Sequence, residues 1–373
     1  MRIAVLTNDY PPQSRGGAGI IAELQVRELS RRGHEVKVFT SFPEWISTSR
    51  LVRLFHHLAD LKADRKLCAD IYAWKPEILL THNLTGCGIG TPEALKIAGI
   101  PWVHVLHDVQ LVEPSGRIVK GEAYSVLRTL WRWMWSRLRR RAFGNPTVVV
   151  SPTQWLIDFH REWGLLGASK TMVIPNPVET VETEDEGRGS CLRRNDRGGS
   201  RNDKNILFVG RLDADKGIDV LLRAWEALGE ESSQLSLVGD GERRAEIEAR
   251  KDGRITVYGA QSHDHVMELM RSHGILVVPS LLIENQPTVI LEGLAAGCRV
   301  IASDVGGSPE TLGDAGRIVP AGDVAALKNA IVEALSVEDA ETMRRDEAIE
   351  RIIERHRVEV AVGALESVLM SNR

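Results

Sequence analysis

Two glutamates, Glu284 and Glu292, stand eight residues apart in "LLIENQPTVILEGLAAG", residues 281–297, which otherwise contains apolar, small and uncharged polar residues. Pro287 lies between them and favours the first position of a helix, because it has no N–H and its φ angle is fixed. A helix that begins at Pro287 places Glu284 in the preceding loop and Glu292 about a turn and a half inside the helix. The pattern predicts two carboxylates on either side of a helix start.

The first turn of this expected helix supplies groups that bind anions. The N–H groups of Thr288, Val289 and Ile290 have no partner within the helix and point toward whatever lies before it. The stretch therefore predicts a site for a ligand that carries both an anionic group and hydroxyls that two carboxylates can hold.

A second candidate site lies in "FVGRLDADKGIDVLLRAW". A strand is expected to end at Gly210, and a loop with Arg211 and Lys216 leads into a helix near Gly217. Ligands of open α/β sheets bind at the carboxyl ends of strands, where a guanidinium fork and an ammonium suit a diphosphate. Each cation alone would more readily be a solvated loop charge, but the pair beside glycine favours a site.

Two stretches of the N-terminal half also end strands with polar or small residues. "NDYPPQSRGGAGIIAEL" holds Gly16 and Gly17 before a helix, but it is not G-x-G-x-x-G and the second strand lacks the acidic residue that holds a ribose, so hydride transfer is a poor interpretation. We interpret the glycine pair as a place where the backbone can approach a phosphate or sugar. In "WVHVLHDVQL", His104 is interpreted as a packed residue, and His107 beside Asp108 as a polar contact to substrate.

These sites require parallel sheets to position them. Short β-branched runs alternate with helical patterns through both halves, which predicts an α/β protein with parallel sheets covered on both faces. The 373 residues exceed a single core of usual size, so two domains are expected. We expect a Rossmann-like domain over 1–182, a charged, Gly-rich linker over 183–205, a second Rossmann-like domain over 206–355, and a C-terminal helix over 356–373 that can return to the first domain. The alternative for 183–205 is a surface insertion within one domain.

Composition narrows the class of protein. Hydrophobic residues make up 43% and charged residues 26%, as in ordinary soluble globular proteins. The four cysteines are scattered, which argues against a disulfide framework or a zinc site, and neither a signal peptide nor a long apolar run is visible. Residues 1–182 carry 23 Lys and Arg against 17 Asp and Glu, and the remainder 24 against 34. We expect a cytoplasmic protein whose basic N-terminal half meets an anionic partner.

Taken together, these motifs resemble glycosyltransferase family 4, whose members are retaining enzymes of the GT-B fold. The resemblance covers nearly the whole chain. It rests on the "RGGAGIIAEL" loop, the His107–Asp108 pair, "NPV" at 176–178 and G-R-L-x-x-x-K-G at 210–217. It also includes the turns at 239–241 and 306–310 and the two glutamates eight residues apart.

The resemblance implies a reaction and a role for each site residue. Two Rossmann-like domains would face each other across a cleft, and a sugar would pass from a UDP- or GDP-sugar to a glycan or lipid-linked acceptor with retention at the anomeric carbon. Arg211 and Lys216 would bind the donor diphosphate, Glu292 the ribose and Glu284 the sugar hydroxyls, with His107 contacting the sugar from the other domain. The backbone of five residues would touch sugar and phosphate: Asn285, Gln286, Pro287, Thr288 and Val289. No cofactor, metal or nucleic acid is expected.

This chain departs from the family pattern next to the first glutamate. Many members have E-G-F-G where this chain has Glu284-Asn285-Gln286-Pro287, so the donor sugar is left open. Three alternatives also remain: an epimerase on the same architecture, a pyridoxal-phosphate phosphorylase, and a nucleotide-sugar-binding protein without activity. An acceptor-free assay, an absorbance scan and donor binding without turnover distinguish them.

A last motif, "YSVLRTLWRWMWSRLRRRAF" at 124–143, combines aromatic residues with arginines. A helical wheel predicts one core face, made of Leu127, Leu130, Trp131, Met134, Trp135 and Leu138. Trp133 falls on the opposite side near Arg137 and Arg140, which suits peripheral contact with the inner, anionic face of a membrane. The alternative is a surface helix whose Trp133 packs under a neighbouring loop.

Overall fold

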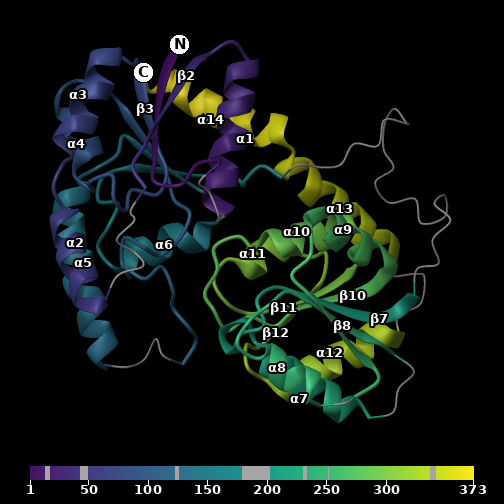
Figure 1. Cartoon of the computed structure of the whole chain (residues 1–373). Coiled ribbons are helices and arrows are strands. Elements are labelled where there is room, and N and C mark those ends of the chain that lie inside the picture. The colour runs from purple at the N-terminus through teal and green to yellow at the C-terminus, as the bar shows by residue number, and fades with distance from the viewer. Residues whose placement is uncertain are drawn as a thin grey trace. The chain divides into compact units, whose positions relative to one another are not determined.

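The computed structural model describes eight stretches of the chain, which are residues 1–12, 17–42, 49–121, 126–178, 202–229, 233–250, 252–336 and 342–373. The chain divides into two compact units (Figure 1). One comprises Met1–Glu179 with His356–Arg373, and the other comprises Thr180–Arg355. Each unit contains one six-stranded sheet, and neighbouring strands in both sheets run parallel. The predicted α/β class with two parallel sheets is confirmed.

The sheet of the first unit has the strand order β2-β1-β3-β4-β5-β6. Its strands are β1 (Arg2–Thr7), β2 (Glu35–Thr40), β3 (Ile78–Thr81), β4 (Trp102–Val105), β5 (Val148–Ser151) and β6 (Lys170–Val173). Every residue of β3, β4 and β5 is buried, as continuous apolar runs require when helices cover both faces of a sheet. The edge strand β6 is largely exposed.

Helices from both ends of the chain cover this sheet. They are α1 (Gly17–Arg31), α2 (Arg50–Ala59), α3 (Arg65–Trp74), α4 (Thr91–Ile97), α5 (Val126–Phe143), α6 (Gln154–Glu162) and α14 (Val358–Ser371). The C-terminal helix α14 lies beside α1 (Figure 1), and its Glu366 carboxylate pairs with Arg32 at 3.0 Å and with His34 at 2.6 Å. The apolar residues Val362, Leu365 and Leu369 of α14 belong to the core of this unit.

The sheet of the second unit has the order β12-β11-β10-β7-β8-β9. Its strands are β7 (Asn202–Val209), β8 (Leu235–Val238), β9 (Ile255–Gly259), β10 (His273–Val278), β11 (Arg299–Ser303) and β12 (Arg317–Val319). Its helices are the 3-10 turn η3 (Ala214–Lys216), α7 (Ile218–Leu228), α8 (Arg244–Glu248), α9 (His263–Ser272), α10 (Thr288–Ala295), α11 (Ser308–Leu312), α12 (Val324–Ser336) and α13 (Thr342–His356). Two apolar clusters, one on each face, form its core.

The segment predicted as a linker, 183–205, is largely outside the described residues. Its last part is described, and β7 already begins at Asn202 and pairs with β10 from its first residue. The strand therefore starts inside the predicted linker range. None of the helices described here is both long and apolar enough to cross a lipid bilayer.

The predicted core face of α5 is wrong for four of its six residues. Leu127, Leu130, Trp131 and Met134 are exposed, whereas the buried positions of α5 are Arg132, Trp135, Ser136, Arg139 and Phe143. The physical reason is the buried carboxylate of Glu113, because a buried carboxylate needs a cation. Glu113 accepts a hydrogen bond from Nε of Arg132 at 3.2 Å. Hydrophobicity alone therefore assigned the inward face incorrectly.

Candidate functional site

Three glycines shape the carboxyl edge of the second sheet. Gly210 follows β7, Gly239 follows β8, and a Cβ on Gly239 would lie 1.9 Å from the carbonyl oxygen of Gly210. Gly217 has a φ of +76°, and a Cβ there would lie 1.8 Å from the carbonyl oxygen of Pro279. These contacts hold the loop after β7 against the ends of β8 and β10 and thereby fix Lys216, which ends η3.

Lys216 and Glu284 meet at this edge although 68 residues separate them. Nζ of Lys216 lies 2.9 Å from Oε1 of Glu284, and the Ser280 hydroxyl donates to the same oxygen at 2.9 Å. The backbone of Glu284 is held by the N–H of Gly307, which donates to its carbonyl oxygen at 2.8 Å. The structure therefore brings together two of the predicted site residues. Ser280 was not predicted, although its place two residues after a buried strand was visible.

Arg211 lies in the same loop and forms ion pairs with two carboxylates. Its guanidinium lies 2.6 Å from Asp213 and 3.2 Å from Asp215. The carbonyl oxygen of Asp215 accepts hydrogen bonds from the N–H groups of Leu281 and Leu282, which ties this loop to the segment that precedes Glu284. The sequence prediction named both cations but not these two aspartates. Their signal was the acidic alternation in "RLDADK", residues 211–216.

Helix α10 starts one residue later than predicted. Pro287 precedes the helix with φ −65° and ψ 112°, an extended conformation, and Thr288 is the first helical residue. The prediction that the N–H of Ile290 is free is wrong, because it donates to the carbonyl oxygen of Pro287 at 3.1 Å. The N–H groups of Thr288 and Val289 belong to the first turn and lack acceptors within the helix.

Glu292 lies in the middle of α10 and is half-buried. Burial raises the pKa of its carboxyl group, and the imidazole of His263 acts more weakly in the opposite direction. Its carboxylate forms no ion pair with any side chain in the described stretches. Half-burial without an ion pair accounts for the raised pKa.

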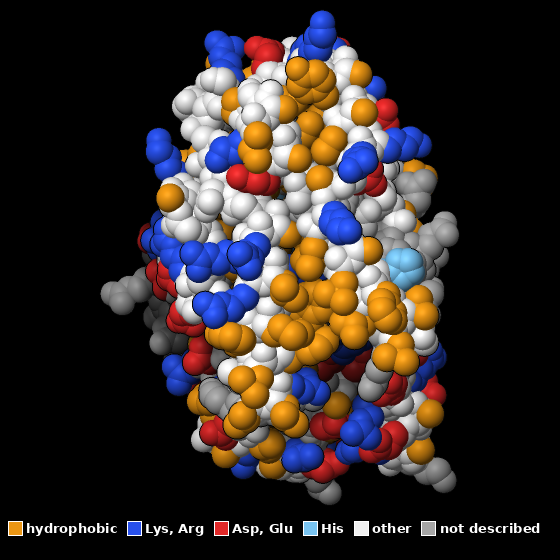
Figure 2. Space-filling model, turned by 90° about the vertical axis from the view of Figure 1, so that its left-hand side faces the viewer, with side chains coloured by type: hydrophobic (Ala, Val, Ile, Leu, Met, Phe, Trp, Pro, Cys, Tyr) orange, Lys and Arg blue, Asp and Glu red, His pale blue; other side chains and the backbone are white. Residues whose placement is uncertain are grey.

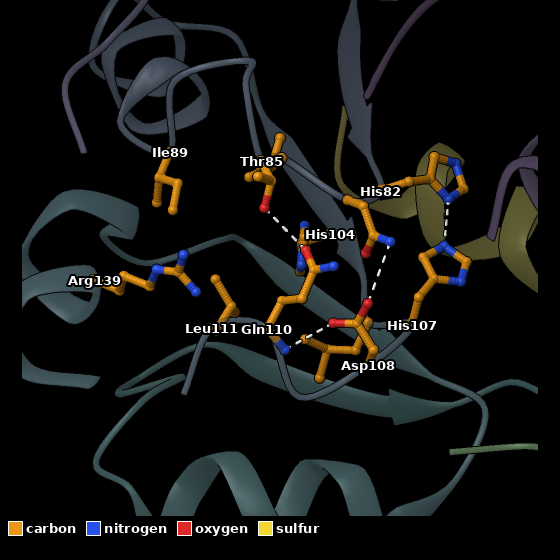
Figure 3. A pocket seen from close by; sticks show the side chains of 12 residues that line it. His82, Thr85, Ile89, His104, His107, Asp108, Gln110, Leu111 and Arg139 are labelled. Atoms are coloured by element: carbon orange, nitrogen blue, oxygen red, sulfur yellow. Dashed lines mark hydrogen bonds between the residues drawn. The ribbon is translucent and has the colours of Figure 1, made fainter. Parts of the chain in front are cut away.

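His107 and Asp108 lie in the first unit, at the carboxyl side of β4, and line a cavity of about 20 Å³ (Figure 3). This volume accommodates about one water molecule. Nε2 of His107 is 2.8 Å from Nδ1 of His82, and the two rings stack at 5.1 Å. Burial lowers the pKa of His107 to about 4, so its imidazole is neutral at neutral pH. His82 was missed by the sequence prediction, although it directly follows the buried run "ILLT".

The carboxylate of Asp108 turns away from its histidine neighbour and is held by local hydrogen bonds (Figure 3). It accepts the N–H of Gln110 at 2.7 Å and the side-chain amide of Asn83 at 3.4 Å. Burial raises the pKa of Asp108 to about 6, although the Gln110 hydrogen bond and the nearby Arg139 oppose this shift. His104, interpreted as a packed residue, is buried and its Nδ1 lies 2.7 Å from the Thr81 hydroxyl.

The buried histidines predict a pH dependence of stability. Burial lowers the pKa of His107 and His160 to about 4 and that of His82 and His104 well below the ordinary histidine value, so the unfolded chain binds more protons between pH 4 and that ordinary value. The free energy of unfolding should therefore fall as pH drops through this range. For His107→Gln, the slope should be smaller by up to about 1.4 kcal/mol per pH unit. Urea unfolding at a series of pH values measures this, and identical slopes for both proteins would contradict it.

The remaining predicted residues occupy three other places. Gly17 is the first residue of α1, and a Cβ on it would have no neighbour within 4 Å, so the space above it is open. Gly16 lies outside the described residues. Asn285 and Gln286 lie in the loop between Glu284 and α10. Trp133, Arg137 and Arg140 are exposed on α5, with the Arg137 guanidinium 4.6 Å from the centre of the Trp133 ring.

Two protein-family descriptions match this chain. The family description "Glycosyltransferase Family 4" matches residues 15–182, and "Glycosyl transferases group 1" matches residues 203–337. The two matches adjoin the linker region and together cover most of the chain. The chain belongs to glycosyltransferase family 4. As a glycosyltransferase of this family, it is an enzyme that transfers sugars.

Relatives of this glycosyltransferase are similar over most of their length or over part of it. A putative teichuronic acid biosynthesis glycosyltransferase of Bacillus subtilis is 23% identical over 346 residues, which is 84% of this chain and 83% of the relative. A phosphatidyl-myo-inositol mannosyltransferase of Mycobacterium leprae is 35% identical over 140 residues, 35% of this chain and 37% of that one.

Solved structures establish the GT-B fold for this chain. A protein of Anabaena in complex with UDP matches with a TM-score of 0.70 and 17% identity, over 100% of both chains. An alpha,alpha-trehalose-phosphate synthase of Burkholderia xenovorans, in complex with glucose-6-phosphate, matches with a TM-score of 0.69 and 17% identity, over 99% of this chain and 100% of the other.

Proposed function

We propose that this glycosyltransferase moves a sugar from a UDP- or GDP-sugar to a glycan or lipid-linked acceptor, with retention at the anomeric carbon and without a metal. The observation that carries the proposal is the carboxyl edge of the second sheet, where Lys216, Arg211 and the first turn of α10 share one loop system with Glu284. Such an edge combines cations and backbone N–H groups that can bind a diphosphate with carboxylates that can accept hydrogen bonds from sugar hydroxyls. The UDP in the Anabaena structure and the teichuronic acid relative support the same class of donor and a role in cell-surface polysaccharide or glycolipid synthesis.

The charges of this edge suggest how the donor binds. The two cations form ion pairs with three carboxylates, Asp213, Asp215 and Glu284. Without a donor, these side chains together carry no net positive charge. A diphosphate that reaches Lys216 must compete with Glu284. We infer that Glu284 leaves the ammonium group on donor binding and accepts hydrogen bonds from sugar hydroxyls. Lys216 then binds the diphosphate as a point charge.

The proposed chemistry is leaving-group stabilisation. The bond between the anomeric carbon and the phosphate oxygen breaks, and negative charge grows on the nucleoside diphosphate. Lys216, Arg211 and the N–H groups of Thr288 and Val289 would stabilise that charge, the kind of preorganised electrostatics that often dominates catalysis. The acceptor hydroxyl forms the new bond on the same face of the sugar, and its proton passes to the leaving phosphate oxygen. No protein nucleophile is assigned.

The two glutamates should respond differently to neutralisation. Glu284→Gln should tighten binding of the nucleoside diphosphate alone about fivefold, because a competing carboxylate worth about 1 kcal/mol leaves Lys216. The same variant should weaken the intact sugar donor. Glu292→Gln should weaken the nucleoside diphosphate about tenfold or more, because a charge-assisted hydrogen bond to a hydroxyl is lost. Calorimetry with UDP, GDP and their sugars measures all of these affinities.

Thermal unfolding separates this role of Glu292 from a structural one. Because burial raises the pKa of Glu292, its contribution to stability is present at low pH and is lost as pH rises through that raised value. At neutral pH, Glu292→Gln should therefore be as stable as the wild type or more stable. A variant that melts earlier and keeps full UDP and GDP affinity would contradict the ribose role.

A further inference from the structure

Helices α2 and α5 expose large apolar side chains on one face of the first unit, called here the α2–α5 face. Its exposed apolar residues are Leu51, Val52, Phe55 and Leu58 of α2, and Val126, Leu127, Leu130, Trp131, Trp133 and Met134 of α5. Leu127 is 78% exposed, Leu51 72% and Phe55 71%. Figure 2 shows hydrophobic side chains gathered on this side of the molecule, with Lys and Arg side chains beside them. A contiguous apolar surface of this kind marks an interaction site.

Helix α2 is amphipathic, and its apolar side faces outward. None of its residues from Leu51 to Ala59 is buried. It is fastened to α5 by its polar side, where the ring of His57 lies 5.9 Å from that of Trp135 and its Nδ1 lies 3.5 Å from Arg139. An amphipathic helix normally stays on a protein by burying its apolar stripe. On α2 the apolar stripe is exposed instead and is available to a partner.

Helix α5 repeats this inverted arrangement. Its inward positions include Arg132 and Arg139, both buried, while Leu127, Leu130 and Met134 face outward. Arginine is rarely buried without a paired acid, and Arg132 has one in Glu113 at 3.2 Å. Two neighbouring helices that both direct polar groups inward and apolar groups outward are explained by a face that is covered in use.

The charges of the two helices select the kind of partner. Neither Arg50–Ala59 nor Val126–Phe143 contains an aspartate or glutamate. The charged residues exposed on α5 are Arg128, Arg137, Arg140 and Arg141. Two copies of this face would bring like charges together, which disfavours a homodimer. An anionic surface that also accepts apolar side chains fits both properties.

We propose that the α2–α5 face docks on the surface of an anionic phospholipid bilayer. Leu51, Phe55, Leu127 and Trp131 enter the boundary between headgroups and acyl chains, and the arginines contact the phosphate groups. Trp133, stacked under the Arg137 guanidinium at 4.6 Å, lies at the level of the headgroups. This contact does not depend on the transfer reaction proposed above, so vesicle binding is measured without donor or acceptor.

The first experiment uses the wild-type protein and two kinds of vesicle. One kind contains equal parts of phosphatidylglycerol and phosphatidylcholine, and the other contains phosphatidylcholine alone. We expect cosedimentation with the anionic vesicles at low salt, at least about tenfold weaker binding to the neutral vesicles, and loss of binding on adding salt. Brominated acyl chains should quench the tryptophan fluorescence of the wild type more than that of a Trp131→Phe, Trp133→Phe variant.

Variants then separate the two helices from the rest of the surface. Leu51→Ser, Phe55→Ser, Leu127→Ser and Trp131→Ser combined should lower vesicle binding at least about tenfold, and so should Arg137→Ser, Arg140→Ser and Arg141→Ser combined. The matched control is Val332→Ser with Met370→Ser, two exposed apolar residues on α12 and α14, which should bind as the wild type does. Circular dichroism verifies that each variant is folded.

Three outcomes would overturn the proposal. Absence of wild-type binding to anionic vesicles at low salt removes it. Equal binding by the control and by the apolar variant shows that another surface is responsible. A wild-type dimer in sedimentation velocity that the apolar variant abolishes, together with no vesicle binding, assigns the face to a second copy of the chain.

Discussion

Lys216→Ala should lower kcat/KM for glycosyl transfer about a hundredfold while the protein remains folded. A charge-assisted contact to the developing charge of the leaving diphosphate is worth about 3 kcal/mol in the transition state. Arg211→Ala should have a loss of the same order. The matched control is Lys204→Ala, which removes an exposed lysine near the start of β7, at the other end of the strand from the site. Near-normal turnover in both Lys216→Ala and Arg211→Ala would refute the assignment.

A double variant distinguishes binding of the diphosphate from a merely structural ion pair. Because Lys216 lies 2.9 Å from Glu284, removing the ammonium group also leaves that carboxylate without its cation. If Lys216 served only to hold Glu284, the double variant Lys216→Ala, Glu284→Gln would be no slower than Glu284→Gln alone. We expect it to be much slower, since the diphosphate loses its own cation.

The sheets were readable from the sequence because their central strands are continuous apolar runs. The runs "ILLT", "WVHV" and "VVVS" correspond to β3, β4 and β5, which are buried throughout. The strands β6 and β12 were missed. Both lie at the end of a sheet, where residues need not be apolar. Strand β6 is largely exposed, and β12 has three residues of which one is buried.

The site was readable in its residue types but not in its pairings. Lys216 and Glu284 could be placed on one edge because parallel strands end at the same side of a sheet. The sequence gives no distances, however. The ion pair between Lys216 and Glu284 and the ion pairs of Arg211 with Asp213 and Asp215 could therefore not be predicted. Helix α5 shows the same limit, because buried Glu113 reverses the face that hydrophobicity alone would turn inward.

Gly217→Ala should lower the free energy of unfolding of the second unit by about 3 kcal/mol or more. Two effects combine at this residue. Its φ of +76° is unfavourable for any L side chain, at about 1–2 kcal/mol, and the added Cβ would lie 1.8 Å from the carbonyl oxygen of Pro279. The backbone carbonyl of Pro279 cannot move aside as a flexible side chain could. The loop that carries Lys216 must therefore move away from β10.

Gly229→Ala is the control, because Gly229 caps the other end of α7 with a φ of +77° and has no atom within 4 Å of an added Cβ. Only the backbone conformation opposes this change, so a loss of about 1–3 kcal/mol is expected. Trp225, the one tryptophan between residues 180 and 355, reports on this unit through fluorine NMR of protein labelled with fluorotryptophan. Equal losses for the two variants would show that Gly217 does not lie against Pro279. A larger loss for Gly217→Ala, with weaker UDP or GDP binding while the variant is still folded, would show that the close approach of two loops is what places Lys216 for the donor.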